Sequence, residues 1–315
     1  MKAAECRVAF VGAGNMAREH IRAFSDVPHV TLSGIFSRTR GRAETLAKEF
    51  HIHGVYSSLD SLYEATHADL VVISVFETAM LPVSVAAFDH PWTVLMEKPP
   101  GYNRMQAQEI LHDARTKNRR VFVGLNRRLL SGSQAAINNL AENPSPRFIH
   151  VQDQQSLEQA KAIGHLDIVV QNWMYANSIH LVDYLRFFGR GTITSIQPVL
   201  SWDSKNPGIV LAKIVFSGGD IGIYEGIWNG PGPWAVTVTT PLRRWEMRPL
   251  EHASFQNSGE RTMNPVSIHP WDEQFKPGFR RQAEEAVQGA MGVPSKCATI
   301  EDAYDTMCLI EGIFS

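Results

Sequence analysis

The first 125 residues alternate between short apolar runs and segments with helical periodicity. The apolar runs hardly alternate with polar residues, as expected for strands buried on both faces of a sheet, and they cover residues 8–11, 30–36, 70–75, 93–96 and 121–125. Between them, small and apolar residues recur at i, i+3, i+4 and i+7 over residues 43–50 and 107–114, which predicts helices. Asn103 and Gln106 resemble a capping box before the second helix. The alternation predicts a doubly wound parallel α/β sheet of the Rossmann type.

After about residue 126 the pattern changes. Strand-like segments now follow one another across turns rich in Gly and Pro, at residues 148–152, 209–216, 221–227 and 234–240. Residues 217–220, Ser-Gly-Gly-Asp, predict a hairpin turn. Helical patterns cover residues 133–141, 179–188, 279–287 and 300–314. Strand after strand indicates an antiparallel or mixed sheet, so we expect a dinucleotide-binding domain at residues 1–125 and an α+β domain at residues 126–315.

A glycine-rich fingerprint lies between the first predicted strand and the first helix, and reads Gly12-Ala13-Gly14-Asn15-Met16-Ala17. In such a turn Gly12 permits the sharp bend, Gly14 lets the backbone approach a pyrophosphate, and a small Ala17 lets the helix pack closely on the sheet. The helix N-terminus adds unpaired N–H groups and a partial positive charge. We predict that residues 12–16 bind a dinucleotide; the alternative is a glycine-rich turn that binds nothing.

The end of the second strand indicates which dinucleotide is bound. NAD sites place an Asp or Glu about 20 residues past the fingerprint, on the ribose hydroxyls, whereas this chain has Ser37, Arg38, Thr39 and Arg40 there. The Arg38 guanidinium can bond a 2′-phosphate and stack on adenine. Charge-assisted bonds of this kind contribute about 1.5 to 3 kcal/mol, or roughly 10- to 150-fold in affinity. We predict NADP rather than NAD, although NAD remains possible if Arg38 and Arg40 are solvated loop charges.

Composition and charge exclude several classes of protein. Lys plus Arg number 30 and Asp plus Glu 32, a net charge of −2 without basic tracts, which argues against a nucleic-acid or membrane surface. Residues 1–5 lead straight into the first strand and no apolar run approaches membrane-spanning length, so we expect a soluble, cytoplasmic protein. Three cysteines without metal spacing predict idle thiols, and His51 and His53 lack a third ligand, so no metal site is expected.

A second group of candidate residues, Glu97-Lys98-Pro99-Pro100, follows the predicted strand at residues 93–96. The carboxyl ends of such strands line the ligand crevice, so Lys98 is expected to point toward the nicotinamide. Partial desolvation there would lower the pKa of Lys98 and suit it to exchanging a proton with a substrate oxygen. Lys98-Pro99 is also a candidate cis peptide bond. The alternative is a surface Glu-Lys pair before a turn.

The ordered set of motifs resembles the glucose-fructose oxidoreductase, inositol dehydrogenase and rhizopine-catabolism (Gfo/Idh/MocA) family. The fingerprint with Ser37-Arg38 is followed by Glu97-Lys98-Pro99, by Gly124-Leu125-Asn126-Arg127-Arg128 and by Ile179-His180-Leu181-Val182-Asp183. Residues 278–279, 298–303 and 309–312 resemble the family's C-terminal helices. Each motif is weak alone, whereas their order and spacing over nearly the whole chain are specific.

This resemblance implies an N-terminal Rossmann domain and a C-terminal substrate-binding and oligomerisation domain with an open, mostly antiparallel sheet, which makes homodimers or homotetramers. It also implies an enzyme that oxidises or reduces a hydroxyl or ketone on a sugar, cyclitol or sugar derivative with NAD or NADP. Lys98 matches the catalytic lysine of the family and His180 the histidine that acts beside it as acid or base. Asp183, three residues after His180, is placed to fix the ring tautomer. A structural histidine is the alternative.

Two departures from the family pattern alter these expectations. The usual Asp four residues before the histidine is Ala176 here, so its acid or base is missing. Where many members carry Thr-Pro and then a histidine near the nicotinamide, this chain has Ser74-Val75-Phe76 and then Glu77. We still place Ser74, Val75, Phe76, Glu97 and Lys98 in the cofactor pocket, with Phe76 covering a ring face.

The substrate and the final activity stay open at this level. Candidate substrate contacts are Arg127, Arg128, Trp173, Tyr175, Asn177 and His180, since Arg suits a phosphate or carboxylate and aromatic rings suit a sugar face. Either Arg is equally suited to a salt bridge, and Trp228, Trp234 and Trp245 to core or interface. We favour an NADP-dependent oxidoreductase of carbohydrates. The alternatives are a dinucleotide-binding sensor or partner protein without efficient turnover, or a retained cofactor used for epimerisation or glycoside cleavage.

Overall fold

The computed structural model describes residues 5–315, and the chain divides into two compact units. The first unit runs to Leu129 and also takes in Pro270–Tyr304, while the second consists of Leu130–His269 and Asp305–Ser315. The division therefore differs from the expected domains, 1–125 and 126–315, mainly in the return of residues 270–304 to the first unit. The expectation for the amino-terminus concerned residues 1–4, which lie outside the described residues.

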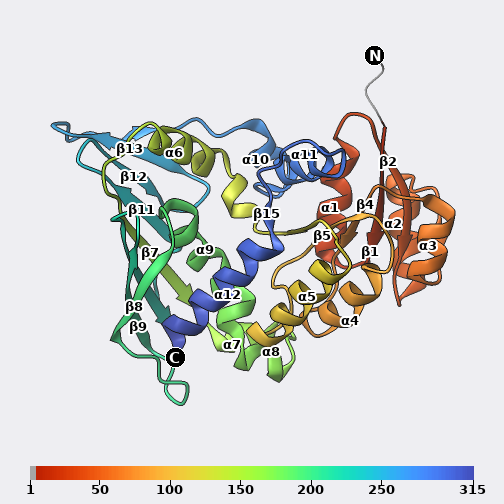
Figure 1. The fold of residues 1–315 in the computed structure, drawn as a ribbon, viewed down its shortest axis with the longest axis horizontal. Coiled ribbons are helices and arrows are strands. Elements are labelled where there is room, and N and C mark those ends of the chain that lie inside the picture. Colours follow the sequence, from red (N-terminus) through yellow and green to blue (C-terminus); the bar gives the residue numbers. More distant parts are fainter. Residues whose placement is uncertain (1–4) are drawn as a thin grey trace. The chain divides into compact units, whose positions relative to one another are not determined.

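The first unit is built on the predicted parallel sheet (Figure 1). Its strand order is β15-β6-β5-β4-β1-β2-β3, and every neighbouring pair is parallel except β15 with β6. The five predicted runs are all strands, two of them ending earlier than expected. The strands are β1 Cys6–Val11, β2 Val30–Phe36, β3 Val55–Tyr56, β4 Leu70–Ile73, β5 Thr93–Met96, β6 Val121–Val123 and β15 Ala298–Thr299.

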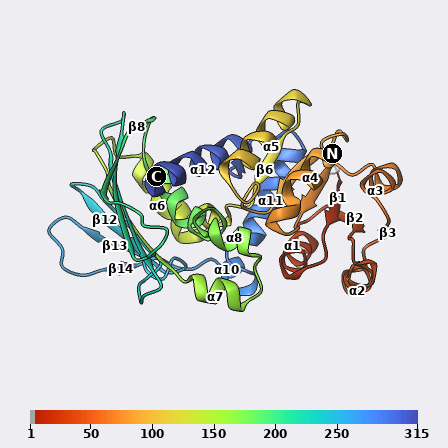
Figure 2. The ribbon, with the colours of Figure 1, turned by 90° about the horizontal axis from the view of Figure 1, so that it is seen from below.

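Helices cover both faces of this sheet, as the double winding requires (Figure 2). Figure 2 shows α1 and α2 on one side of the strands and α3, α4 and α5 on the other. As predicted, Asn103 caps α5, because its side-chain oxygen accepts the Gln106 N–H at 3.0 Å. The helices are α1 Asn15–Ser25, α2 Arg40–Phe50, α3 Leu59–Thr66, α4 Glu77–Ala87, α5 Arg104–Thr116, the 3-10 turn η1 Asn126–Leu129, α10 Pro270–Gln274 and α11 Phe279–Ala290.

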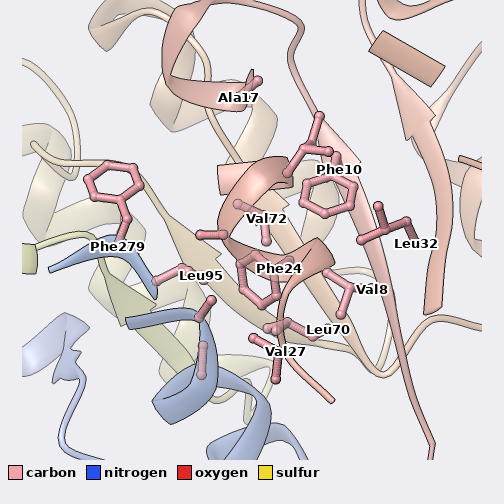
Figure 3. Close-up of a cluster of buried hydrophobic side chains, with 14 of the residues drawn as sticks. Val8, Phe10, Ala17, Phe24, Val27, Leu32, Leu70, Val72, Leu95 and Phe279 are labelled. Atoms are coloured by element: carbon pink, nitrogen blue, oxygen red, sulfur yellow. The ribbon is translucent and has the colours of Figure 1, made fainter. Parts of the chain in front are cut away.

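A shared apolar core explains why residues 270–304 belong to the first unit. Phe279 at the start of α11 is buried with Phe24 of α1 and with Leu70 and Leu95 of the sheet (Figure 3). Further along α11, Ala283 and Ala286 are buried in the same cluster. If this helix left the first unit, apolar surface on the helix and on the sheet would be exposed to water. That exposure costs about 25 cal/mol of free energy per Å².

The second unit is built on a mixed, mostly antiparallel sheet of order β14-β13-β12-β11-β7-β10-β9-β8. Among the described strands of this second sheet, only β7 and β10 form a parallel pair. β9 and β10 form the predicted hairpin across residues 217–220. The strands are β7 Phe148–Gln155, β8 Ile193–Leu200, β9 Ile209–Phe216, β10 Ile221–Trp228, β11 Ala235–Thr239, β12 Arg243–Met247, β13 Ala253–Asn257 and β14 Asn264–Pro265.

One face of this sheet carries helices and the other does not (Figure 1). Buried residues alternate with half-exposed ones along β7, β9 and β10, and α9 packs on the buried face. Among the elements that the structure describes, Figure 1 draws none over the opposite face. The helices are α6 Ser131–Ala141, α7 Leu157–Ala162, α8 Asp167–Gln171, the π-helical turn η2 Met174–Ser178, α9 Ile179–Phe188 and α12 Ile300–Phe314, which runs from the first unit into the second. Within residues 5–315, no helix has both the length and the apolar character that crossing a bilayer requires.

Candidate active site

The carboxyl ends of the parallel strands bring the predicted cofactor residues of the first unit to one edge. The residue that follows each of three strands donates its N–H to the last carbonyl oxygen of a neighbouring strand. Gly12 donates to β2, Ser74 to β1 and Glu97 to β4, and each of these hydrogen bonds is 2.8 Å long. Ser37 follows β2 at the same edge. Open α/β sheets bind ligands at this edge, where the strand order reverses on either side of β1.

Gly12 and Gly14 are glycines for different reasons. Gly12 has a φ of +107°, and a Cβ there would lie 2.1 Å from the Ser74 carbonyl oxygen, so conformation and packing both exclude a side chain. Gly14, the N-cap of α1, has a φ of −93°, and no described atom lies within 4 Å of the place its Cβ would take. The protein's own packing therefore does not require a glycine at position 14, and the open space fits a group that approaches from outside.

The N-terminus of α1 is arranged to receive an anion. No side chain caps it, and its first turn contains no acidic residue. The N–H groups of a first helical turn lack intrahelical acceptors and carry a partial positive charge, which is the environment that a pyrophosphate takes in dinucleotide sites. Ala17 is 2 % exposed, as expected for close packing of the helix on the sheet. These residues fit the phosphates of a dinucleotide.

In the turn after β2, Arg38 and Arg40 have different surroundings, although the sequence alone did not tell which of them is a solvated loop charge. Arg40 donates through Nε to Glu44 at 2.8 Å, one turn along α2, whereas Arg38 is exposed at the tip of the turn. The Thr39 N–H donates to Ser37 Oγ at 3.3 Å, which shapes the turn. Residues 36–40 contain no carboxylate that would repel a 2′-phosphate. Arg38 thus remains the candidate for phosphate binding, while Arg40, which is also exposed, is paired with Glu44.

Phe76 stands out after β4, because it is 68 % exposed. It is the N-cap of α4, and Ser74 and Val75 before it are half-buried. A large apolar side chain at this edge of the sheet loses contact with water only if something covers it. The proximity of residues 74–76 to the fingerprint is established by the Gly12 contact with Ser74, while their contact with a cofactor stays a prediction.

Lys98 is partly buried directly after β5, and the Lys98-Pro99 peptide bond is cis, as predicted. Burial lowers the pKa of Lys98 below its usual value, against the charges of Glu97 and Glu77, which raise it. The charges of Lys276 and Arg127 lower it further. The direction agrees with the expectation that desolvation lowers the pKa of Lys98. Lys276 was not anticipated, because it lies 178 positions away in a loop before α11.

Behind Lys98 lies a buried pair that sequence reasoning missed. His20 Nε2 is 2.7 Å from Glu97 Oε1, with His20 1 % and Glu97 7 % exposed. Burial by itself raises the pKa of Glu97, but the hydrogen bond and charge of His20, with the neighbouring Lys98, hold it below its usual value. The sequence signal for this pair was a histidine on the apolar face of α1, among the buried residues Ala17, Ile21 and Phe24.

In the second unit, His180 lies in the first turn of α9 directly after a π-helical turn. Such turns are rare and occur frequently at functional sites. His180 is 9 % exposed. Asp183, 2 % exposed, accepts a bond from Thr306 Oγ1 of α12 at 2.9 Å. The bond to Thr306 fixes the Asp183 carboxylate, and its predicted effect on the His180 tautomer stays a prediction.

A buried polar network on β7 orients two of the predicted substrate residues. Gln155 Oε1 accepts from the Trp173 indole N–H at 2.9 Å and from Asn177 Nδ2 at 2.8 Å, and Gln155 Nε2 donates to Asp153. An indole N–H can only donate, so the orientation of the Gln155 amide is fixed. Burial raises the pKa of Asp153, which also accepts from Tyr224 at 2.7 Å. The sequence signal for this network was the presence of polar residues, Asp153 and Gln155, at inward-facing positions of a strand.

Arg127 and Arg128 lie in η1 and have different surroundings. Arg128 forms an ion pair with Asp302 at 3.4 Å, which is the salt-bridge role left open for it. Arg127 belongs to the electrostatic neighbourhood of Lys98. Tyr175 is half-buried in the π-helical turn, and Trp173 is 8 % exposed. Residues 5–315 contain no group of three His, Cys, Asp or Glu side chains placed to hold a metal ion.

Comparison with known families identifies the first of the two units. Residues 6–125 match the model of the oxidoreductase family with an NAD-binding Rossmann fold, Gfo/Idh/MocA. Over these residues the chain is similar to the Gfo/Idh/MocA oxidoreductases. The match confirms the resemblance drawn from the motifs and classes the chain with the oxidoreductases. None of the curated proteins compared with this chain matches it.

Solved structures extend the likeness over both units. A dehydrogenase from Chromobacterium violaceum has a TM-score of 0.85 at 16 % identity, over 99 % of this chain and 95 % of that one. The UDP-N-acetylglucosamine 3-dehydrogenase of Acidithiobacillus ferrooxidans has 0.79 at 16 %, over 98 % and 96 %. A levoglucosan dehydrogenase in complex with NADH and levoglucosan has 0.79 at 16 %, over 98 % and 96 %. At this identity the likeness shows the fold, with its parallel and mostly antiparallel sheets, as predicted.

The departures from the family pattern are visible in the structure. Ala176 is 2 % exposed, inside the π-helical turn, so the place of the usual Asp is apolar and packed. Asn177, the next residue, is half-buried and bound to Gln155. An amide cannot accept the proton that a carboxylate would take. Neither Ala176 nor Asn177 therefore supplies the acid or base of the usual Asp.

Proposed function

We propose that this protein is an NADP-dependent oxidoreductase that transfers hydride between the nicotinamide and a hydroxyl or ketone of a sugar, cyclitol or sugar derivative. The observation that carries the proposal is the position of Lys98. It follows β5 at the edge where Gly12 and the uncapped N-terminus of α1 are arranged for a dinucleotide, and its pKa is lowered by burial. A lysine placed for proton transfer beside a dinucleotide site is what a dehydrogenase requires.

The residues divide the work of the reaction. The nicotinamide, when bound, supplies or accepts the hydride. Lys98 donates a proton from Nζ to the oxygen of a carbonyl as its carbon is reduced, and accepts it back in the oxidation direction. Arg127, in the neighbourhood of Lys98, adds positive charge that favours the amine form. His180 is the second proposed acid or base, with its helix held through Asp183 and Thr306.

Arg38 supports NADP rather than NAD. It is exposed in a turn without carboxylates, and its neighbour Arg40 is engaged with Glu44. A guanidinium in this position binds a 2′-phosphate by charge-assisted bonds. Phe76, largely exposed at the same edge, is proposed to cover a face of the nicotinamide ring.

A carbohydrate substrate is supported by two observations. The solved structures of similar fold include dehydrogenases of a nucleotide sugar and of an anhydrosugar, by their names. In this chain, the Asn177 amide donates to Gln155, so its carbonyl oxygen is the atom proposed to accept a substrate hydroxyl. Arg127, Trp173 and His180 complete the proposed substrate contacts.

The uncovered face of the second unit's sheet is proposed to form a homodimer or homotetramer. Phe148 of β7 and Ile221 of β10 are paired neighbours there, 46 % and 37 % exposed, and Ile209 of β9 is 55 % exposed on the same face. Apolar side chains that gather on an exposed sheet face favour burial against another protein surface. A second copy of this chain offers the same face.

A second function is favoured by one specific observation, the buried Ala176 in place of the family's Asp. With one acid-base group missing, the chain would bind the dinucleotide and respond to it as a sensor or partner protein, without efficient turnover. Use of a retained cofactor for epimerisation or glycoside cleavage is the related enzymatic alternative.

The experiment that tests the proposal is a pair of fluorescence titrations with NADPH and NADH, followed by Lys98→Ala in a turnover assay with keto-sugars and nucleotide sugars. We expect NADPH to bind at least about tenfold more tightly than NADH. Lys98→Ala should abolish turnover with an unchanged unfolding midpoint, because the side chain lies at a strand end. Undiminished turnover in that variant would remove the mechanism, and turnover absent from the wild type over the whole panel would favour the sensor.

A further inference from the structure

The His20–Glu97 pair lies directly behind the proposed acid-base group. His20 belongs to the buried face of α1, and its ring packs on Phe279 of α11 with centroids 4.6 Å apart. Its Nε2 lies 2.7 Å from Glu97 Oε1. The pKa of Glu97 lies below its usual value, and an ionised carboxylate can only accept, so Nε2 carries the hydrogen and donates. The pair joins the helix of the fingerprint to the strand end that carries Lys98.

The other oxygen of Glu97 faces Lys98. The backbone N–H of Lys98 donates to Glu97 Oε2 at 3.2 Å, so the carboxylate is bonded on both oxygens. On the remaining side, a Cβ at Gly124 would come within 3.4 Å of the Glu97 carboxyl carbon and Oε1. The carboxylate is therefore bonded on both oxygens and packed against Gly124, and its negative charge acts on the amine of the next residue, Lys98.

Charges of both signs within the first unit act on Lys98. Glu97 and Glu77 favour its charged form, and Lys276 and Arg127 oppose it. Of the two carboxylates, Glu97 is the one buried at 7 % exposure. A buried carboxylate stays ionised only if hydrogen bonds and opposite charge compensate for the lost hydration. His20 supplies that compensation at Oε1, the oxygen that the Lys98 backbone does not bond.

We propose that His20 is a positioning residue for Lys98: by donating to Glu97 it keeps this buried carboxylate ionised and fixed, and the ionised carboxylate sets how firmly the Lys98 amine holds its proton. The inference deepens the proposed function, since it rests on Lys98 as the acid-base group. His20 touches neither substrate nor nicotinamide in this role. It acts on the reaction only through Glu97.

The test measures Lys98 itself, in the full-length protein without cofactor or substrate. The amine is labelled with acetic anhydride at a series of pH values, and the Lys98 peptide is quantified by mass spectrometry against the peptide of Lys48, which is exposed on α2. Glu97→Gln removes the charge and keeps the shape. His20→Phe keeps a ring against Phe279 and removes the donor, while His20→Gln keeps an N–H donor at similar reach. Glu64→Gln, an exposed carboxylate on α3, is the matched control.

We expect Glu97→Gln and His20→Phe to raise the labelling rate of Lys98 about tenfold on the acid side of its titration. The reason is that losing an opposite charge within about 4–6 Å lowers an amine pKa by about one unit or more, and each unit is tenfold in free amine. His20→Gln should stay within about twofold of the wild type, and Glu64→Gln should leave the rate unchanged. In the pH profile of kcat, the apparent pKa that belongs to Lys98 should be lower in His20→Phe than in the wild type.

Each other outcome overturns the proposal in a defined way. Wild-type labelling in both Glu97→Gln and His20→Phe means that the pair does not act on Lys98. A change in Glu97→Gln alone removes His20 from the proposal, and equal changes in His20→Phe and His20→Gln reduce it to a packing role. If His20→Phe fails to fold, Glu97→Gln and His20→Gln still decide. Since labelling needs no turnover, a failure of the proposed redox function would leave this result intact and would appear only in the Lys98→Ala assay.

Discussion

At the scale of single residues, the two fingerprint glycines have different roles: the fold requires Gly12, whereas Gly14 is proposed to serve ligand binding. Gly12 is required by its backbone and by the Ser74 carbonyl 2.1 Å from its missing Cβ, whereas Gly14 borders open space. Gly12→Ala should therefore destabilise the first unit by about 1–3 kcal/mol, the usual cost of such strain. Gly14→Ala should change the unfolding free energy by less than about 0.5 kcal/mol but weaken NADPH binding at least about tenfold. Urea unfolding and fluorescence titration measure the two effects.

The contrary result for this pair is easy to recognise. A Gly14→Ala protein with wild-type NADPH affinity would show that no phosphate approaches the backbone there. A Gly12→Ala protein as stable as the wild type would show that the contact with Ser74 relaxes without cost.

Arg38 and Arg40 form the second matched pair. Because the Arg40 guanidinium is bonded to Glu44 at 2.8 Å and Arg38 is exposed at the turn, we expect only Arg38 to contact a 2′-phosphate. Arg38→Ala should weaken NADPH binding by roughly 10- to 150-fold and leave NADH binding nearly unchanged. Arg40→Ala should affect neither nucleotide by more than about twofold. Equal NADPH affinity in the wild type and Arg38→Ala would withdraw the assignment of NADP.

At the scale of elements, Asp220 fastens the β9–β10 hairpin to two other segments of the second unit. The carboxylate is 0 % exposed, and it accepts the N–H groups of Arg147 at 2.8 Å and Arg190 at 2.9 Å and the Arg190 guanidinium at 2.6 Å. Burial by itself would raise the pKa of Asp220, but these bonds hold it below its usual value. The hairpin turn thus holds the segments before β7 and after α9 in register.

Asp220→Asn should destabilise the second unit by about 3 kcal/mol at neutral pH, since it leaves the half-buried Arg190 guanidinium and two N–H groups without a charged acceptor. The folded pKa is depressed, so this contribution is fully present above the ordinary Asp value and is lost as pH falls through the folded value. The difference between wild type and variant should therefore shrink below about pH 4. Asp203→Asn, in an exposed loop, is the control. A difference that stays constant down to pH 2 would contradict the assignment.

At the scale of the whole molecule, the uncovered sheet face is the proposed interface between copies of this chain. Phe148 and Ile221 lie side by side on that face, so Ile221→Glu places a charge inside any interface formed there. We expect light scattering to give a dimer or tetramer for the wild type and a monomer for Ile221→Glu, since an unpaired buried charge is costly. Leu242→Glu, 62 % exposed in the turn between β11 and β12, should assemble normally. A monomeric wild type would remove this face as an interface.

The division of the chain shows where local pattern stops being sufficient. Residues 279–287 were recognised as a helix from their periodicity, yet periodicity does not say which core a helix joins. Phe279 belongs to the same buried cluster as Phe24, Leu70 and Leu95, and β15 pairs with β6, so the segment completes the first unit. The decision rests on contacts between residues more than 150 positions apart, which no local rule contains.

The sequence by itself determined the parallel sheet, the fingerprint turn, the strand-end position of Lys98 and the helix that carries His180. It could do so because periodicity, glycine chemistry and strand-end position are local properties of the chain. Only the tertiary structure decided the rest. It distinguished Arg38 from Arg40, brought His20 to Glu97, placed Lys276 near Lys98 and bound Asn177 to Gln155. These are pairings across long stretches of chain, set by which surfaces pack together and by the need of each buried polar group for a partner.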